Sequence, residues 1–176
     1  IQTPAYPLLL VDVLGAGAAH VGVFAAAAAA AALAGGGGWG WLVDRRGSLE
    51  ALRVMYLVGA TTPLIYFVAW SPWVLVASSV TDSLMAVGLE VVWMLAVIDV
   101  AGPKRTAQYV AIGATLAGVR GVLGPLAGGV LIHLGGVHAV FLVAAALMLA
   151  GAWGAGRGLA ARAPARALSG ASLRDG

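Results

Sequence analysis

Apolar residues run in long blocks along this chain, and short polar interruptions separate the blocks. A helix needs about 20 mainly apolar residues to cross ~30 Å of hydrocarbon, and most blocks have that length. The pattern predicts a truncated span over 3–15 and full spans over 18–43, 49–69, 73–99, 106–132 and 137–157. Short connections make consecutive spans antiparallel neighbours. The sequence therefore predicts an all-α, polytopic membrane bundle over residues 1–157, with five full spans and part of a sixth.

Both ends of the chain depart from this pattern. Ile1 already lies at an apolar segment, with no basic leader region and no cleavage pattern after it, so we expect a fragment and not a signal peptide. Residues 158–176 are rich in Arg, Ala, Gly and Ser, and we expect them to form a disordered tail.

Composition supports a membrane protein, because 61% of the residues are hydrophobic and only 10% are charged, which is far from the soluble globular range. The many Ala and Gly residues favour close packing of helices in lipid. There is no cysteine, and His20, His133 and His138 are not spaced as metal ligands. We therefore expect neither a metal site nor a cofactor.

Nine of the ten Lys and Arg residues fall at alternate connections or in the tail: Arg45, Arg46, Arg53, Lys104, Arg105, Arg157, Arg162, Arg166 and Arg174. Such an excess marks the cytoplasmic side, so we expect a cell-membrane protein with a cytoplasmic C-terminus and no nucleic-acid partner. Four tryptophans are predicted to be interfacial anchors: Trp39, Trp41, Trp70 and Trp73.

The connection after the 18–43 span carries a motif made of Gly40, Leu42, Asp44, Arg45, Arg46 and Gly47. From physics alone it is a hydrophilic loop with arginines on the cytoplasmic side. The order of residues resembles the GxLxDRxG signature of the major facilitator superfamily of transporters, which lies in the cytoplasmic turn after the second helix of each half. The resemblance implies that this chain is the C-terminal half of such a transporter and that an N-terminal half of the same chain is missing.

In that family the carboxylate and arginines of this turn are thought to hold neighbouring helices in one conformation and to release them in another. The resemblance therefore implies that Asp44 and Arg45 form a conformational latch. Helix N-termini attract anions. We therefore expect Asp44 to dock near Thr106, at the start of the predicted 106–132 span.

A second resemblance involves Gly118, Gly121, Gly124, Pro125 and Gly128, which are similar to the glycine and proline pattern of the family's fifth helix and its eleventh-helix counterpart. Three of these glycines share one helix face, which allows close helix contact, and the proline removes a backbone donor and permits a bend. We expect this segment to pack and to act as a hinge.

Asp82, Glu90 and Arg120 lie inside predicted spans, where a charge must face protein or water. Asp82 lies about 13 Å from one boundary and Arg120 about 20 Å from the other, depths that are compatible with an ion pair. Glu90 has no obvious partner. Trp93, one turn from Glu90, is expected to pack against a neighbouring helix.

Two interpretations of these charges remain open. In the first, Asp82 and Arg120 form a static ion pair, and Glu90 reaches toward the inner surface. In the second, a carboxylate in an apolar cavity accepts protons and couples their flow to movement of a solute. Glu90 is the first candidate for this carboxylate and Asp82 is the second. Asp12 and Asp99, near span ends, are interpreted as boundary residues.

The function that these features favour is secondary active transport of a small organic solute by alternating access, with proton-coupled efflux, and the partners are the solute, protons and the lipid bilayer. The alternative is a helical membrane scaffold or sensor that transports nothing. An intramembrane enzyme is less favoured still, because no GxSxG, HExxH or P-loop pattern occurs in the sequence.

Overall fold

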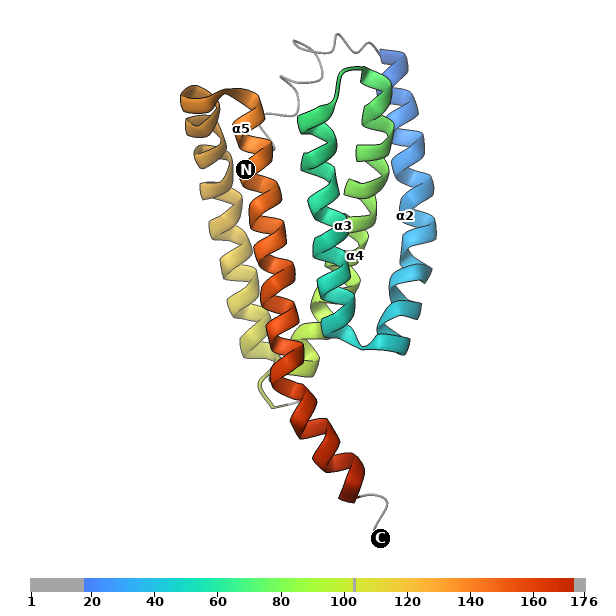
Figure 1. The fold of residues 1–176 in the computed structure, drawn as a ribbon, viewed down its shortest axis with the longest axis vertical. Coiled ribbons are helices and arrows are strands. Elements are labelled where there is room, and N and C mark those ends of the chain that lie inside the picture. The colour runs from blue at the N-terminus through green and yellow to red at the C-terminus, as the bar shows by residue number, and fades with distance from the viewer. Residues whose placement is uncertain (1–17, 103, 173–176) are drawn as a thin grey trace.

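The computed structural model describes residues 18–102 and 104–172, which form long helices joined by short turns (Figure 1). The elements are α2 (Ala18–Arg46), α3 (Ser48–Val68), the short 3-10 helix η2 (Pro72–Val74), α4 (Leu75–Ala101) and α5 (Thr106–Ser172). Four of these helices are long and apolar enough to cross a membrane. The predicted all-helical membrane architecture is confirmed. The truncated span over 3–15, and Asp12 within it, lie outside the described residues, so the total number of spans stays a prediction.

Helix α5 breaks sharply at Gly136, whose φ of 74° and ψ of 178° are not helical. The break divides α5 into a first arm, residues 106–135, and a second arm, residues 137–172. Figure 1 shows the two arms side by side and antiparallel. This break lies within the connection predicted between the 106–132 and 137–157 spans.

Three connections depend on a glycine with positive φ: Gly47 at 84°, Gly102 at 68° and Gly136 at 74°. Residues with a side chain rarely adopt this backbone conformation, so glycine allows the chain to reverse within very few residues. At Gly47 the amide also donates a hydrogen bond to the carbonyl oxygen of Val43 at 2.8 Å, which closes the end of α2.

The alternating helix directions bring the connections that contain Gly47 and Gly102 to one end of the bundle (Figure 1). We call this the basic end, because its connections carry Arg45, Arg46, Lys104 and Arg105. The opposite end holds the connection from Trp70 to Trp73 and the break at Gly136, and we call it the tryptophan end.

The core consists of two buried clusters between the helices. The cluster near the tryptophan end joins α2, α3, α4 and the second arm, and contains Phe24, Tyr66, Leu75, Val140 and Phe141. The cluster near the basic end joins α2, α3 and α4, and contains Trp39, Ala51, Met55 and Val92.

Trp39 is not an interfacial anchor, so that prediction was wrong. Its side chain is only 6% exposed, and its indole Nε1–H donates a hydrogen bond to the carbonyl oxygen of Leu84 at 2.8 Å. Gly88 of α4 makes room for the ring, because a Cβ there would lie 2.9 Å from Trp39 Cε2. The other predicted anchors, Trp41, Trp70 and Trp73, are exposed.

Hydroxyl groups add further links from α4 to its neighbours. Ser83 Oγ donates to the carbonyl oxygen of Ala28 on α2 at 2.7 Å. The hydroxyls of Thr62 on α3 and Thr81 on α4 share a hydrogen bond of 2.8 Å. Hydrogen bonds of this kind hold helices together where lipid supplies no competing partner.

The predicted packing face on the first arm is only partly realised. Gly124 and Gly128 are buried, but Gly118 and Gly121 face open space, with no atom within 4 Å of an added Cβ. The backbone stays helical through Pro125, since Gly136 is the break recorded within α5. Gly113 makes the close approach instead: a Cβ there would lie 2.3 Å from the Trp93 ring, so Trp93 packs as expected.

The C-terminal segment differs from the predicted disordered tail. Helix α5 continues through Gly158 to Ser172, and Figure 1 shows this part extending beyond the bundle. Ala, Leu and Arg, which dominate the segment, are among the strongest helix formers, and this composition favours a helix.

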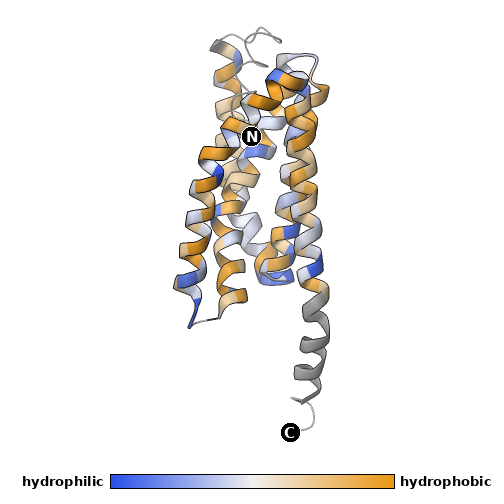
Figure 2. Ribbon diagram, turned by 90° about the vertical axis from the view of Figure 1, so that its left-hand side faces the viewer, coloured by the Kyte–Doolittle hydropathy of each residue, from blue (hydrophilic) through white to orange (hydrophobic). Residues whose placement is uncertain are grey.

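The outer surface of the bundle is strongly apolar. Figure 2 shows hydrophobic residues along the lengths of the helices, with hydrophilic ones at the turns and at single positions within the helices. The first arm exposes a row of large apolar side chains: Ile112, Leu116, Val119, Val122, Leu123, Leu126 and Val130. Exposed apolar surface of this extent fits a helix that faces lipid or another membrane segment.

Candidate functional site

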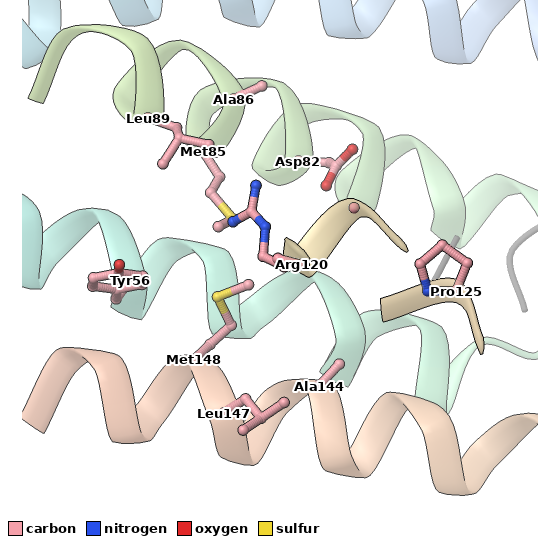
Figure 3. A pocket seen from close by; sticks show the side chains of 11 residues that line it. Tyr56, Asp82, Met85, Ala86, Leu89, Arg120, Pro125, Ala144, Leu147 and Met148 are labelled. Carbon is pink, nitrogen blue, oxygen red and sulfur yellow. The ribbon is translucent and has the colours of Figure 1, made fainter. Parts of the chain in front are cut away.

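A cavity of about 540 Å³ lies between α3, α4 and both arms of α5 (Figure 3). Its lining consists of Tyr56 from α3; Asp82, Met85, Ala86 and Leu89 from α4; Arg120, Gly121 and Pro125 from the first arm; and Ala144, Leu147 and Met148 from the second arm. Helix α2 contributes no lining residue. The cavity is therefore formed where α4 separates from the arms of α5.

Two opposite charges line this cavity from different helices. Figure 3 shows the Arg120 side chain reaching from the first arm toward α4, and the Asp82 carboxylate directed toward the first arm. Within the part of the chain that the structure describes, the ion pair found is the one between Arg53 and Glu50, at 3.8 Å, near the basic end. The pair considered between Asp82 and Arg120 is therefore not formed in this structure, because the two helices diverge around the cavity.

The remaining walls are mainly apolar and are held by close helix contacts. Met85 lies against Gly59 of α3, where a Cβ would come within 2.5 Å of its sulfur. Tyr56 lies against Gly151 of the second arm, at 3.2 Å from a Cβ placed there. Thioether side chains are flexible and adapt to the shape of a ligand. The glycines thus fix the backbones, and the side chains remain adjustable.

Glu90, the first candidate for proton coupling, does not line the cavity, although Glu90 and Asp82 are both exposed. It follows Asp82 by eight positions on α4. That spacing turns a side chain by about 80° around a helix and moves it by about 12 Å along the axis. Asp82, the second candidate, is the carboxylate that the structure places in the cavity.

The signature motif occupies the last turn of α2 and the connection to α3. Gly40 faces open space, Leu42 packs on the core cluster at the basic end, and the guanidinium carbon of Arg45 lies 4.7 Å from the centre of the Trp41 ring. Arg46 is exposed at the helix end. Gly47, with its positive φ, is the residue that makes the turn possible.

Asp44 is exposed and has no hydrogen bond or ion pair among the described residues. The hydroxyl of Thr106 instead donates to the carbonyl oxygen of Gly102 at 2.8 Å. The expected docking of Asp44 near Thr106 is therefore not formed in this structure, and Thr106 uses its hydroxyl within its own helix start.

A contact next to the motif was missed by the sequence interpretation. Ser48, the first residue of α3, is 3% exposed, and its Oγ donates a short hydrogen bond to Asp99 Oδ2 near the end of α4. Asp99 is thus more than a boundary residue. The available signal was topological: antiparallel neighbours bring the start of one helix beside the end of the next, and both ends lie at the basic end.

The family model described as Major Facilitator Superfamily matches residues 1–172. The chain belongs to the Major Facilitator Superfamily. The resemblance stated from the signature motif is therefore confirmed. Neither a curated protein nor a solved structure matches the chain.

Membership in the Major Facilitator Superfamily means a multi-pass membrane protein that transports small solutes and binds them as substrates. Members are transporters and not enzymes. A solute site in such a protein lies between helices, and the cavity that holds Asp82 and Arg120 fits this position.

Two of the three histidines of this superfamily member, His20 and His138, make ring contacts. The His20 ring lies 4.7 Å from that of Trp73, and the His138 ring meets Phe67 edge-on at 5.7 Å. No group of three metal-ligating side chains occurs among the described residues.

Proposed function

We propose that this protein is a secondary active transporter that exports a small organic solute from the cell by alternating access, in exchange for protons. In this proposal the chain supplies the C-terminal half of the transporter, and an N-terminal half of the same chain supplies the other wall of the solute pathway. The observation that carries the proposal is the cavity between α4 and the arms of α5, which holds two opposite charges inside membrane-spanning helices.

The proposed orientation follows from charge. The basic end, with Arg45, Arg46, Lys104 and Arg105, faces the cytoplasm, and so does the C-terminus, while the tryptophan end faces outward. Exposed Trp70 and Trp73 then lie at the outer membrane interface. The membrane concerned is the cell membrane.

Asp82 is the proposed proton carrier. The charged or titratable groups that line the cavity with it are Arg120 from the first arm and Tyr56 from α3. An arginine keeps its charge in proteins, whereas a carboxyl can gain and lose a proton. Proton binding at Asp82 changes the charge of the cavity from balanced to positive. A change of this kind shifts the equilibrium between two conformations of the protein when the proton binds.

The packing around α4 supports alternating access. Hydrogen bonds join α4 to α2 and α3, while its contact with α5 is sparse and surrounds the cavity. This combination suits movement of the first arm of α5 against a body formed by α2, α3, α4 and the second arm, which packs along α3. The turn with Asp44 and Arg45 is proposed as the latch, and the bond between Ser48 and Asp99 holds the helix ends beside it.

The test uses the full-length protein reconstituted in liposomes with the pH dye pyranine trapped inside. Three solutes are added in turn: leucine as a zwitterion, choline as a cation and lactate as an anion. We expect at least one of them to move protons through the unmodified protein and not through Asp82→Asn. Glu90→Gln, on the same helix but outside the cavity, is the matched control and retains proton movement.

Two outcomes would contradict the proposal. If none of the three solutes moves protons, the result favours the scaffold or sensor. Proton movement that survives Asp82→Asn but disappears in Glu90→Gln removes Asp82 as the proton carrier and restores the acid first favoured from the sequence.

A further inference from the structure

We infer that the cavity binds an apolar zwitterion, that is, a small molecule with an ammonium group, a carboxylate and an aliphatic body, as in a free amino acid or a short peptide with aliphatic side chains. This inference rests on the proposed function, because it assigns the class of solute to the cavity described above. It is carried by the charges of the cavity and by the nature of its walls.

The two charges have opposite signs and come from different helices. Asp82 lies on α4 and Arg120 on the first arm of α5, and neither has an ion-pair partner among the described residues. A charge inside the membrane is costly unless something pairs with it. A zwitterion supplies both partners at once: its ammonium group pairs with the carboxylate of Asp82, and its carboxylate accepts hydrogen bonds from the guanidinium of Arg120.

A solute with a single charge fits less well. A cation would pair with Asp82 but would add a second positive charge near Arg120. An anion would pair with Arg120 and would add a second negative charge near Asp82. Like charges in one cavity repel each other, which raises the free energy of binding. Asp82 and Arg120 together therefore select against a solute that carries a single positive or a single negative charge.

The walls specify the rest of the solute. Met85, Leu89, Leu147 and Met148 present aliphatic and thioether surface from two sides of the cavity. An aliphatic body buries itself against such surface, and the methionines adjust to its shape. The volume of about 540 Å³ holds a small organic molecule and leaves room for a second residue, so an amino acid and a dipeptide both fit by size.

The experiment measures binding to the full-length protein in nanodiscs by isothermal titration calorimetry. Leucine and leucyl-leucine distinguish a free amino acid from a short peptide as the source of the zwitterion. N-acetylleucine lacks the ammonium charge, and leucine amide lacks the carboxylate. We expect one of the two zwitterions to bind. If leucine binds, each single-charge analogue of leucine should bind about tenfold more weakly than leucine. If the dipeptide is preferred, the single-charge analogues should not bind at all.

Two variants test whether the ammonium group of the solute contacts Asp82 and its carboxylate contacts Arg120. In Asp82→Asn, leucine loses its advantage over N-acetylleucine but keeps its advantage over leucine amide. In Arg120→Gln, the reverse holds. A purely structural role would lower the affinity for all ligands together and would leave these ratios unchanged. Glu90→Gln and Arg53→Gln, which lie outside the cavity, are the controls, and size-exclusion profiles show whether each variant is folded.

Unchanged ratios in both variants, or binding of choline or lactate without binding of either zwitterion, would overturn the inference. The result is separable from the proposed function. Binding with the expected ratios but without proton movement removes proton-coupled export and retains the zwitterion site. Proton movement driven by choline or lactate alone removes the zwitterion site and retains the transporter.

Discussion

Helix α4 packs in two different ways along its opposite sides. Toward α2 and α3 it is tightly joined, with Trp39 bonded to the Leu84 carbonyl and with Gly88 leaving no room for a side chain. Toward α5 it touches little, apart from Trp93 against Gly113, and a cavity with Asp82 and Arg120 takes the place of packed side chains.

The difference shows how one helix can serve both stability and function. Close packing also joins α3 to the second arm of α5, so α2, α3, α4 and that arm are expected to move as one body. A cavity provides room for a solute and for movement of the helices around it. Substitutions on the tight side should therefore cost stability, while those on the cavity side should change binding more than stability.

The largest effect is expected at Gly88 on the tight side. A Cβ at Gly88 would lie 2.9 Å from both Met55 Cγ and Trp39 Cε2, and the further methyl groups of valine have no space. Gly88→Val should lower the free energy of unfolding by about 1–3 kcal/mol. SDS titration of the protein in mixed micelles measures this change. Gly38→Val on α2, where nothing lies within 4 Å, is the control, and equal losses in the two variants would contradict the packing described.

A smaller effect is expected where α4 meets the first arm. A Cβ at Gly113 would lie 2.3 Å from the Trp93 ring, but the contact between α4 and α5 is sparse, so the ring or the arm can move aside. Gly113→Ala should lower the free energy of unfolding by about 1 kcal/mol, at the low end for overpacking. The same SDS titration applies. Gly118→Ala, in open space on the same arm, should instead be neutral or stabilising.

Removing the indole donor of Trp39 tests one hydrogen bond on the tight side. Trp39→Phe keeps an aromatic ring but loses the bond to the Leu84 carbonyl oxygen. The expected loss is about 0.6 kcal/mol, the average for hydrogen bonds between membrane helices. Unfolding is followed by loss of the monodisperse peak on size-exclusion chromatography. Trp70→Phe, at an exposed position, is the control, and an equal change there would show that the bond has no specific role.

The smallest effect on stability is expected at Gly59, although its consequence for binding is large. A Cβ there meets the sulfur of Met85 at 2.5 Å, which is near the end of a flexible side chain that can turn away. Gly59→Ala should change the free energy of unfolding by less than about 0.5 kcal/mol. Because Met85 lines the cavity, leucine should bind several-fold more weakly in calorimetry. Gly36→Ala on α2 should change neither quantity, and a large loss of stability in Gly59→Ala would contradict an adjustable cavity wall.

Most of the fold could be predicted from the sequence, because hydrophobic length and turn chemistry are local signals. The spans over 18–43 and 49–69 agree with α2 and α3 to within three residues at each end, and Gly47 lies in the connection predicted between them. Which residues pack on which was not predictable. Trp39 has the composition of an interfacial residue, and only the opposing glycine on α4 makes it a core residue.

The candidate site was predicted in part. Asp82 and Arg120 were selected because charges inside spans need partners, and both line the cavity. Glu90 was favoured over Asp82 because the sequence gives depth along a helix but not the direction in which a neighbouring helix lies. For the same reason, the glycines with open space at 118 and 121 could not be told apart from Gly113, which makes close contact.

The single-residue reversal at Gly136 constrains how the two arms of α5 can move. Consecutive Cα atoms are about 3.8 Å apart, so the arms cannot part at the tryptophan end without unwinding a helix. At the basic end no such tether joins them. The two arms are therefore joined at the tryptophan end, and any opening between them widens toward the end that carries Arg105 and Arg157.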